Sequence, residues 1–205
     1  MEPISSFKGY MESMRWHNSK QKNFISCILF VNPNDPDNII VREILNNLET
    51  YHVFSGKDMT FFMPGYTEDI ILFDQHKEFD RVDFSRRNFS LENFQRFVHD
   101  LERISTWRYS LQTDMLFLNM VNNELDFSYV YNYQLETLMH DGEIPNVNTL
   151  FNELRLAVEE TESLQLEERF MKKALAGLVK CFLSKFKNWR KLIKSAQYRP
   201  HNYTK

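Results

Sequence analysis

The chain has 205 residues, of which 42% are hydrophobic and 26% charged, and its net charge is −3 at pH 7; these values are typical of a globular domain with a substantial core. Only five residues are glycine, whereas average usage of about 7% would give roughly fourteen, which argues against a function that needs a glycine-rich phosphate loop. The sequence also has no signal-peptide pattern and no apolar run long enough for a membrane span.

Residues 1–23 are predicted to be a polar lead-in that contains a short helix. The next eight residues, 24–31, are almost all apolar or β-branched and end at a run of Asn, Asp and Pro, which predicts a buried strand. Apolar residues then recur at helical spacing from Ile39 to Leu48, so a helix is expected to follow. Strand followed by helix is the first half of a βαβ unit, and we predict an α/β domain over residues 24–146.

The loop at residues 32–38 has two interpretations. Asp35 can serve as the N-cap, Pro36 fits the first helical position and Asp37 lies in the first turn, where the helix dipole favours negative charge. The loop also follows a central strand, at the edge where open α/β sheets bind ligands. We therefore expect a cap, with Asn32, Asn34 and Asp35 as candidate ligand-binding residues.

A second strand is predicted at residues 58–63, stopped by Pro64-Gly65. Gly56 is a plausible left-handed cap for the preceding helix. Strand, helix and strand in so short a stretch predict a right-handed parallel crossover, which places Tyr66 at the same sheet edge as the first loop. A Pro-Gly pair usually forms only a turn, but this position makes Tyr66 a further candidate ligand-binding residue.

Residues 67–89 are irregular and mixed in charge, as in many substrate loops and partner surfaces. His76, Asp80 and Asp83 lack the spacing of metal ligands, so we expect a solvated loop and no metal site. Glu68, beside Tyr66, is the one candidate catalytic carboxylate.

Ser90 is predicted to cap a regular amphipathic helix that ends before Trp107. Residues 114–121 are a third apolar strand candidate, and residues 127–135 alternate strictly between apolar or aromatic and polar side chains. This alternation predicts a half-exposed strand at the sheet edge. Its tyrosines either form a stacking platform for a base or peptide or face the core with their hydroxyls at the rim.

Residues 147–198 are predicted to form a C-terminal helical pair, with an acidic helix near 148–162, a basic helix near 167–195 and a polar tail at 199–205. Residues 165–205 carry a net charge of +9, which leaves −12 on the rest of the chain. Either the two helices pair, or the basic face binds phosphate or nucleic acid, or it docks on a membrane surface or partner helix. The basic face consists of Lys185, Lys187, Arg190, Lys191 and Lys194.

The sequence lacks the motifs of serine hydrolases, P-loops, dinucleotide-binding loops, zinc proteases and thiol redox centres. The two cysteines, Cys27 and Cys181, lie in apolar patterns and are expected to be reduced and unreactive thiols of a cytoplasmic protein.

Two segments carry a resemblance to a known group of proteins. They are Phe-Ser-Gly at 54–56 leading into Met-Thr-Phe-Phe-Met-Pro-Gly-Tyr at 59–66, and Trp-Arg-Tyr-Ser at 107–110 leading into Asp-Met-Leu-Phe-Leu-Asn at 114–119. Over residues 24–135 the chain resembles poorly characterised Rossmann-like proteins of bacterial anti-phage defence loci, which are related in outline to the TIR-like fold. The resemblance implies a cytoplasmic defence accessory or sensor and transfers no catalytic residue.

Together these patterns predict a three-layer Rossmann-like α/β domain with a short, mostly parallel sheet and the C-terminal helical pair. The first functional hypothesis is a binding or sensor module for a partner protein, a second copy of the chain or a nucleotide-like ligand, without a bound cofactor. The second is an enzyme that processes a nucleotide such as NAD, with Glu68 and Tyr66 in its pocket. The third is nucleic-acid binding through the last helix.

Overall fold

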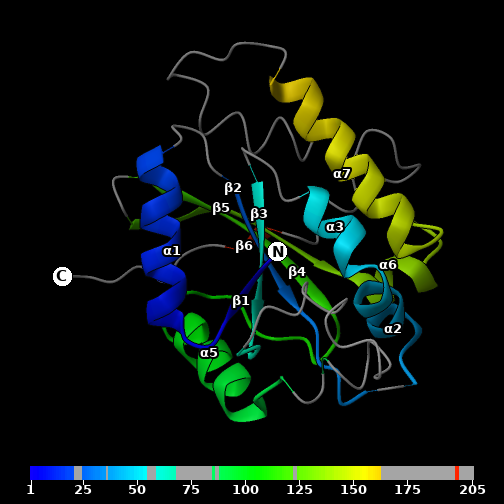
Figure 1. The fold of residues 1–205 in the computed structure, drawn as a ribbon, viewed down its shortest axis with the longest axis horizontal. Helices are drawn as coiled ribbons and strands as arrows, with labels where there is room; N and C mark the ends of the chain where they lie inside the picture. Colours follow the sequence, from blue (N-terminus) through cyan, green and yellow to red (C-terminus); the bar gives the residue numbers. More distant parts are fainter. Residues whose placement is uncertain are drawn as a thin grey trace.

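The computed structural model describes residues 1–20, 25–35, 37–54, 59–67, 85, 88–121, 124–162 and 197–198 (Figure 1). The strands are β1 (Glu2–Ile4), β2 (Ile25–Phe30), β3 (Met59–Pro64), β4 (Asp114–Val121), β5 (Glu124–Gln134) and β6 (Gln197–Tyr198). The helices are α1 (Phe7–Lys20), α2 (Ile39–Asn46), α3 (Leu48–Phe54), α5 (Leu91–Ile104), α6 (Leu135–His140) and α7 (Val147–Glu162). The α/β class predicted from the sequence is confirmed.

Within the described residues the strands form one sheet in the order β1-β3-β2-β4-β5-β6. β2 and β3 pair in parallel, with Cys27 opposite Phe61, which confirms the predicted parallel pairing. The sheet is mixed rather than mostly parallel, because β4 and β5 are antiparallel to their neighbours. Asp114, the first residue of β4, lies opposite Phe30, the last residue of β2, so the chain enters β4 at the edge where β2 ends and must run the opposite way.

Both outer strands of the sheet differ from the sequence-based expectation. β1 is not predicted from the sequence, yet it pairs in parallel with β3 through Pro3 and Met63, so residues 1–20 contribute a strand and the predicted helix α1. The prediction that β5 forms the sheet edge is wrong, because Gln197 of β6 pairs with Tyr131.

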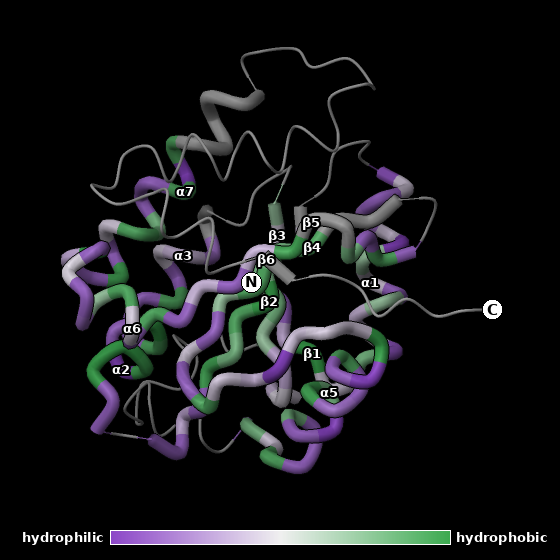
Figure 2. The backbone as a smooth tube through the Cα atoms, turned by 180° about the vertical axis from the view of Figure 1, so that it is seen from behind, coloured by the Kyte–Doolittle hydropathy of each residue, from purple (hydrophilic) through white to green (hydrophobic). Residues whose placement is uncertain are grey.

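Helices cover both faces of the sheet: α1 and α5 lie on one side, and α2, α3 and α7 lie on the other (Figure 1). Alternate residues of β2 serve the two sides, since Leu29 belongs to the buried cluster under α2 and α7 whereas Ile28 and Phe30 belong to the cluster under α1 and α5. Burial on both faces explains why β2 reads as a continuous apolar run. Figure 2 shows the same pattern, with hydrophobic strands inside and mixed helices outside.

Both clusters contain aromatic side chains that pack ring against ring. Tyr51 and Phe151 stack with their ring centroids 3.9 Å apart, and Phe30 stacks on Trp107 at 4.8 Å. Tyr131 and Tyr133 are only 4% and 2% exposed, which confirms the core interpretation of these tyrosines over the stacking platform.

The structure also tests the predicted helix caps. The Ser90 hydroxyl accepts a hydrogen bond from the backbone N–H of Asn93, so the predicted cap of α5 is confirmed. The predicted cap at Asp35 is wrong. Asn38 is the cap of α2, with its Oδ1 accepting from the N–H groups of Ile40 and Val41, whereas the Asp35 backbone forms turns with Asn32 and Asn38.

Cys27 is fully buried in β2, as expected, and burial raises the pKa of its thiol. Cys181, Gly56, residues 68–84 and the predicted basic helix lie outside the described residues. None of the helices that the structure describes combines the length and apolar character needed to cross a membrane.

Candidate functional site

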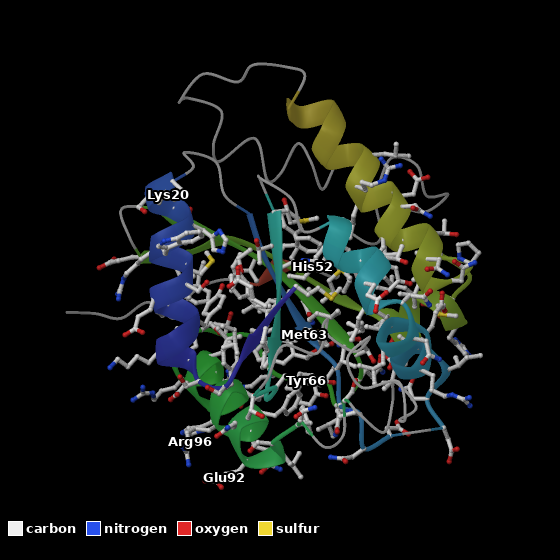
Figure 3. All side chains as sticks on the ribbon, in the orientation of Figure 1. Lys20, His52, Met63, Tyr66, Glu92 and Arg96 are labelled. Carbon is white, nitrogen blue, oxygen red and sulfur yellow. The ribbon has the colours of Figure 1, made fainter. Side chains whose placement is uncertain are left out.

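The parallel pairing of β2 and β3 brings the segments that follow both strands to one edge of the sheet, which we call the rim. The rim comprises residues 31–38 after β2, 65–67 after β3, 105–113 before β4 and 135–136 after β5. A direct contact joins the first two segments, because the Tyr66 hydroxyl donates a hydrogen bond to the Val31 carbonyl at 3.4 Å. Figure 3 shows Tyr66 at the lower end of β3, far from Lys20 at the upper end of α1.

The candidate ligand-binding residues occupy this rim in different ways. Asn34 and Asp35 are exposed, and Asn32 is half-buried with its Oδ1 accepting a hydrogen bond from the Asn34 N–H at 3.0 Å. Tyr66 is fully buried, and burial raises the pKa of its phenol well above the ordinary value. The polar side chains of the first loop are therefore accessible to solvent, whereas Tyr66 is buried and joins the two loops through its hydrogen bond to Val31.

A polar network that the sequence-based interpretation missed connects the α2 cap to the start of α6. Glu136 accepts hydrogen bonds from Asn38 Nδ2 at 2.8 Å, from the Thr113 hydroxyl at 2.7 Å and from the Thr113 N–H at 2.8 Å. Asn38 and Glu136 are 98 positions apart in the chain, and no local pattern indicates this contact. The network fixes three segments of the rim relative to one another.

Replacing Asn38 with aspartate is expected to lower the free energy of unfolding by about 1–2 kcal/mol, because the carboxylate keeps the cap but faces the Glu136 carboxylate. Urea unfolding measures the change. Ser90→Asp is the matched control, since it keeps a capping oxygen on α5 and should have little effect. Equal stability of the two variants would contradict the role assigned to the Asn38–Glu136 contact.

Asp114 is a buried carboxylate at the start of β4. Its Oδ1 accepts from the Ser110 hydroxyl at 2.6 Å, and its Oδ2 accepts from the Ser110 N–H at 3.1 Å. Burial raises the pKa of Asp114 to about 6, the nearby Glu136 carboxylate also raises it, and Ser110 and the neighbouring Asn132 amide lower it. A carboxyl group with this pKa exchanges protons near neutral pH, which is common at functional sites.

The loop before β4 is strained and carries an exposed apolar side chain. Leu111 has a φ of 65°, a left-handed conformation that is rare for a residue with a bulky side chain, and it is 87% exposed. Ile39 and Leu91, the first residues of α2 and α5, are also exposed at this rim. Among the described residues, the one other large hydrophobic side chain with high exposure is Trp16.

A second polar cluster, formed by Glu2, Ser13 and His17, lies between β1 and α1. The Glu2 carboxylate accepts from the Ser13 hydroxyl at 2.6 Å and contacts His17 Nε2 at 2.5 Å. Because the carboxylate stands between the serine and the histidine, this order does not activate a serine nucleophile. The cluster instead ties α1 to β1.

The remaining candidate residues receive no structural test. Glu68 and the basic face at Lys185, Lys187, Arg190, Lys191 and Lys194 lie outside the described residues. Across the part of the chain that the structure describes, no three His, Cys, Asp or Glu side chains are grouped so as to hold a metal ion.

The rim is thus polar, jointly built by distant segments and positioned by Glu136 and Tyr66. Comparison with known proteins adds no relative to this description: no protein-family model, no curated protein and no solved structure matches the chain.

Proposed function

We propose that this chain is a cytoplasmic binding or sensor module that recognises a nucleotide-like ligand at the rim. The observation that supports this function is the convergence of the β2, β3 and β4 segments at one sheet edge. β2 lies between β3 and β4, and the chain passes from β2 to β3 on one side before it reaches β4 on the other. In open α/β sheets, ligands bind outside the carboxyl ends of parallel strands, as at β2 and β3 here, and β4 adds the segment before its amino end.

The exposed side chains suit a ligand with many hydroxyl and N–H groups. The Asp35 carboxylate accepts hydrogen bonds from sugar hydroxyls, and the Asn34 carboxamide both donates and accepts. The helices on both faces and the parallel first half of the sheet favour a Rossmann-like, three-layer interpretation of the fold. A role in bacterial defence rests on the resemblance of residues 54–66 and 107–119 alone.

Removing both exposed polar groups with Asn34→Ala and Asp35→Ala is expected to weaken nucleotide binding about tenfold, because each lost hydrogen bond contributes about 0.5–1.5 kcal/mol. Calorimetric titration with ATP and NAD measures the affinity. Glu124→Ala is the control, since it removes an exposed side chain at the opposite end of β5. An unchanged affinity in the double variant would contradict the proposed site.

Docking of a partner protein is a second candidate, favoured by the exposed apolar side chains of Ile39, Leu91 and Leu111 around the polar rim. The same titration separates the candidates. Failure of the wild-type chain to bind ATP or NAD would favour a protein partner. Turnover of either nucleotide would instead favour an enzyme, with Asp114, whose pKa burial raises to about 6, as the first candidate acid or base.

A further inference from the structure

Three buried polar side chains lie on the α5 side of the sheet, where the loop at residues 105–113 leads into β4. Asp114 and Trp107 are 0% exposed, and Asn132 of β5 is 6% exposed. Phe30 connects two of them, since it pairs with Asp114 across β2 and β4 and stacks on Trp107 with ring centroids 4.8 Å apart. The Asn132 side chain acts on Asp114 as a hydrogen-bond donor and lowers the pKa of that carboxyl, although the geometry of this contact falls short of a full hydrogen bond.

Several hydrogen-bonding atoms of this cluster have no partner. Among the described residues, neither Oδ1 nor Nδ2 of Asn132 makes a hydrogen bond of acceptable geometry, and the Trp107 indole N–H has no acceptor. Each Asp114 oxygen accepts one hydrogen bond from Ser110, although a carboxylate oxygen can accept about two. Buried polar groups are nearly always paired in folded proteins, so this concentration of unpaired groups requires an explanation.

Packing alone does not explain the amide at position 132. Its cross-strand neighbour is Leu116, and Val130 on the same strand belongs to the same apolar cluster as Leu116. A leucine, which has a similar size, would fill this environment without leaving a donor and an acceptor unpaired. A residue that violates a packing rule in this way is expected at a functional position.

We propose that Asp114, Asn132 and Trp107 form a binding site for a planar, nucleobase-like group with neighbouring donor and acceptor atoms. The Asn132 carboxamide offers a donor and an acceptor side by side, which complements the edge of a nucleobase. Asp114 accepts from a ring or exocyclic N–H group, and the Trp107 N–H donates to a carbonyl oxygen or ring nitrogen. Phe30 and Tyr109 add aromatic rings beside Trp107, on which a base can stack.

The loop at residues 105–113 controls access to this site. Its Ser110 holds Asp114 through two hydrogen bonds, and the adjacent Leu111 is in the left-handed conformation, so the closed loop stores strain next to the contact that must open. Ligand binding replaces the Ser110 contacts of Asp114 and releases the loop. This inference rests on the proposed function and assigns the base of the nucleotide to the Asp114 side of the rim.

Asn132→Leu tests the site, with adenosine, guanosine, cytidine and uridine as probes, because nucleosides carry a base but no phosphate. We expect the wild-type chain to bind at least one of them. The variant should lose at least tenfold in affinity while its Tm rises by about 2–4 °C, since an unpaired buried amide has been removed. Titration calorimetry and thermal unfolding give the two values. Asn152→Leu, at an exposed position of α7, should change neither the affinity nor the Tm.

Three results would overturn the inference. A more stable Asn132→Leu variant with unchanged affinity would show that the cluster does not contact the base, and a less stable one would show that the amide has a structural role. If the wild-type chain binds ATP through Asn34 and Asp35 but none of the nucleosides, the rim function stands and only the base site is excluded.

Discussion

Gly65→Ala is expected to lower the free energy of unfolding by about 4 kcal/mol, because strain and overpacking act at the same position. Gly65 has a φ of +87°, and an added Cβ would lie 2.6 Å from Phe89 Cε2 and 2.8 Å from Phe94 Cβ. The backbone cannot move away easily, since the Gly65 N–H donates to the Ile4 carbonyl and its own carbonyl accepts from the Ser90 N–H. Urea unfolding of the two proteins measures the loss.

Gly142→Ala is the matched control, because Gly142 also has a positive φ, of +69°, but an added Cβ would meet nothing within 4 Å. This variant carries the backbone strain alone and should lose only about 1 kcal/mol. Similar losses in the two variants would mean that the contacts of Gly65 with Phe89 and Phe94 do not matter. The difference between the variants therefore isolates the packing that joins β3 to α5 at the rim.

The sequence predicts best those elements whose signals are local. The short apolar run at residues 24–31 is typical of a strand that is buried on both faces, and Ser90 stands directly before a regular amphipathic helix pattern. The parallel pairing follows from the order strand, helix, strand within a short stretch of the sequence. In each case neighbouring residues alone determine the element, so it can be predicted without knowledge of distant contacts.

The cap of α2 shows where local reasoning fails. Asn34, Asp35, Asp37 and Asn38 are all residue types that can cap a helix, and the sequence rule does not choose among them. In the structure the cap is Asn38, whose side-chain amide also donates a hydrogen bond to Glu136, a residue far away in the sequence. The choice depends on a contact between residues 98 positions apart, which no window of the sequence contains.

The burial of Asp114 and Asn132 could not be predicted from the sequence for a related reason. Asp114 looks like a polar residue at the start of an apolar strand, where solvent exposure is the ordinary expectation. In the structure Ser110 of the preceding loop binds the Asp114 carboxylate, and the register of β4 and β5 places Asn132 opposite Leu116, two residues further along β4. β1 is similar: three residues form a strand because β3 offers them an unpaired edge.

Asp114→Asn is expected to remove a pH dependence of stability worth up to about 3 kcal/mol between pH 4 and pH 7. The pKa of Asp114 is about 6 in the folded chain and 3.8 for the free group, so between these values the folded state binds more protons than the unfolded state. The stability that this carboxyl contributes is therefore complete below about pH 4 and is lost as the pH rises through 6. Asparagine does not titrate, and all other groups remain, so the stability of the variant relative to the wild type should increase as the pH rises.

Urea unfolding at several pH values measures this difference, with Asp35→Asn at an exposed rim position as the control that should follow the wild type. Parallel pH curves for Asp114→Asn and the wild type would mean that the loop at residues 105–113 leaves the carboxylate accessible to water, and the closed arrangement over Asn132 would lose its basis.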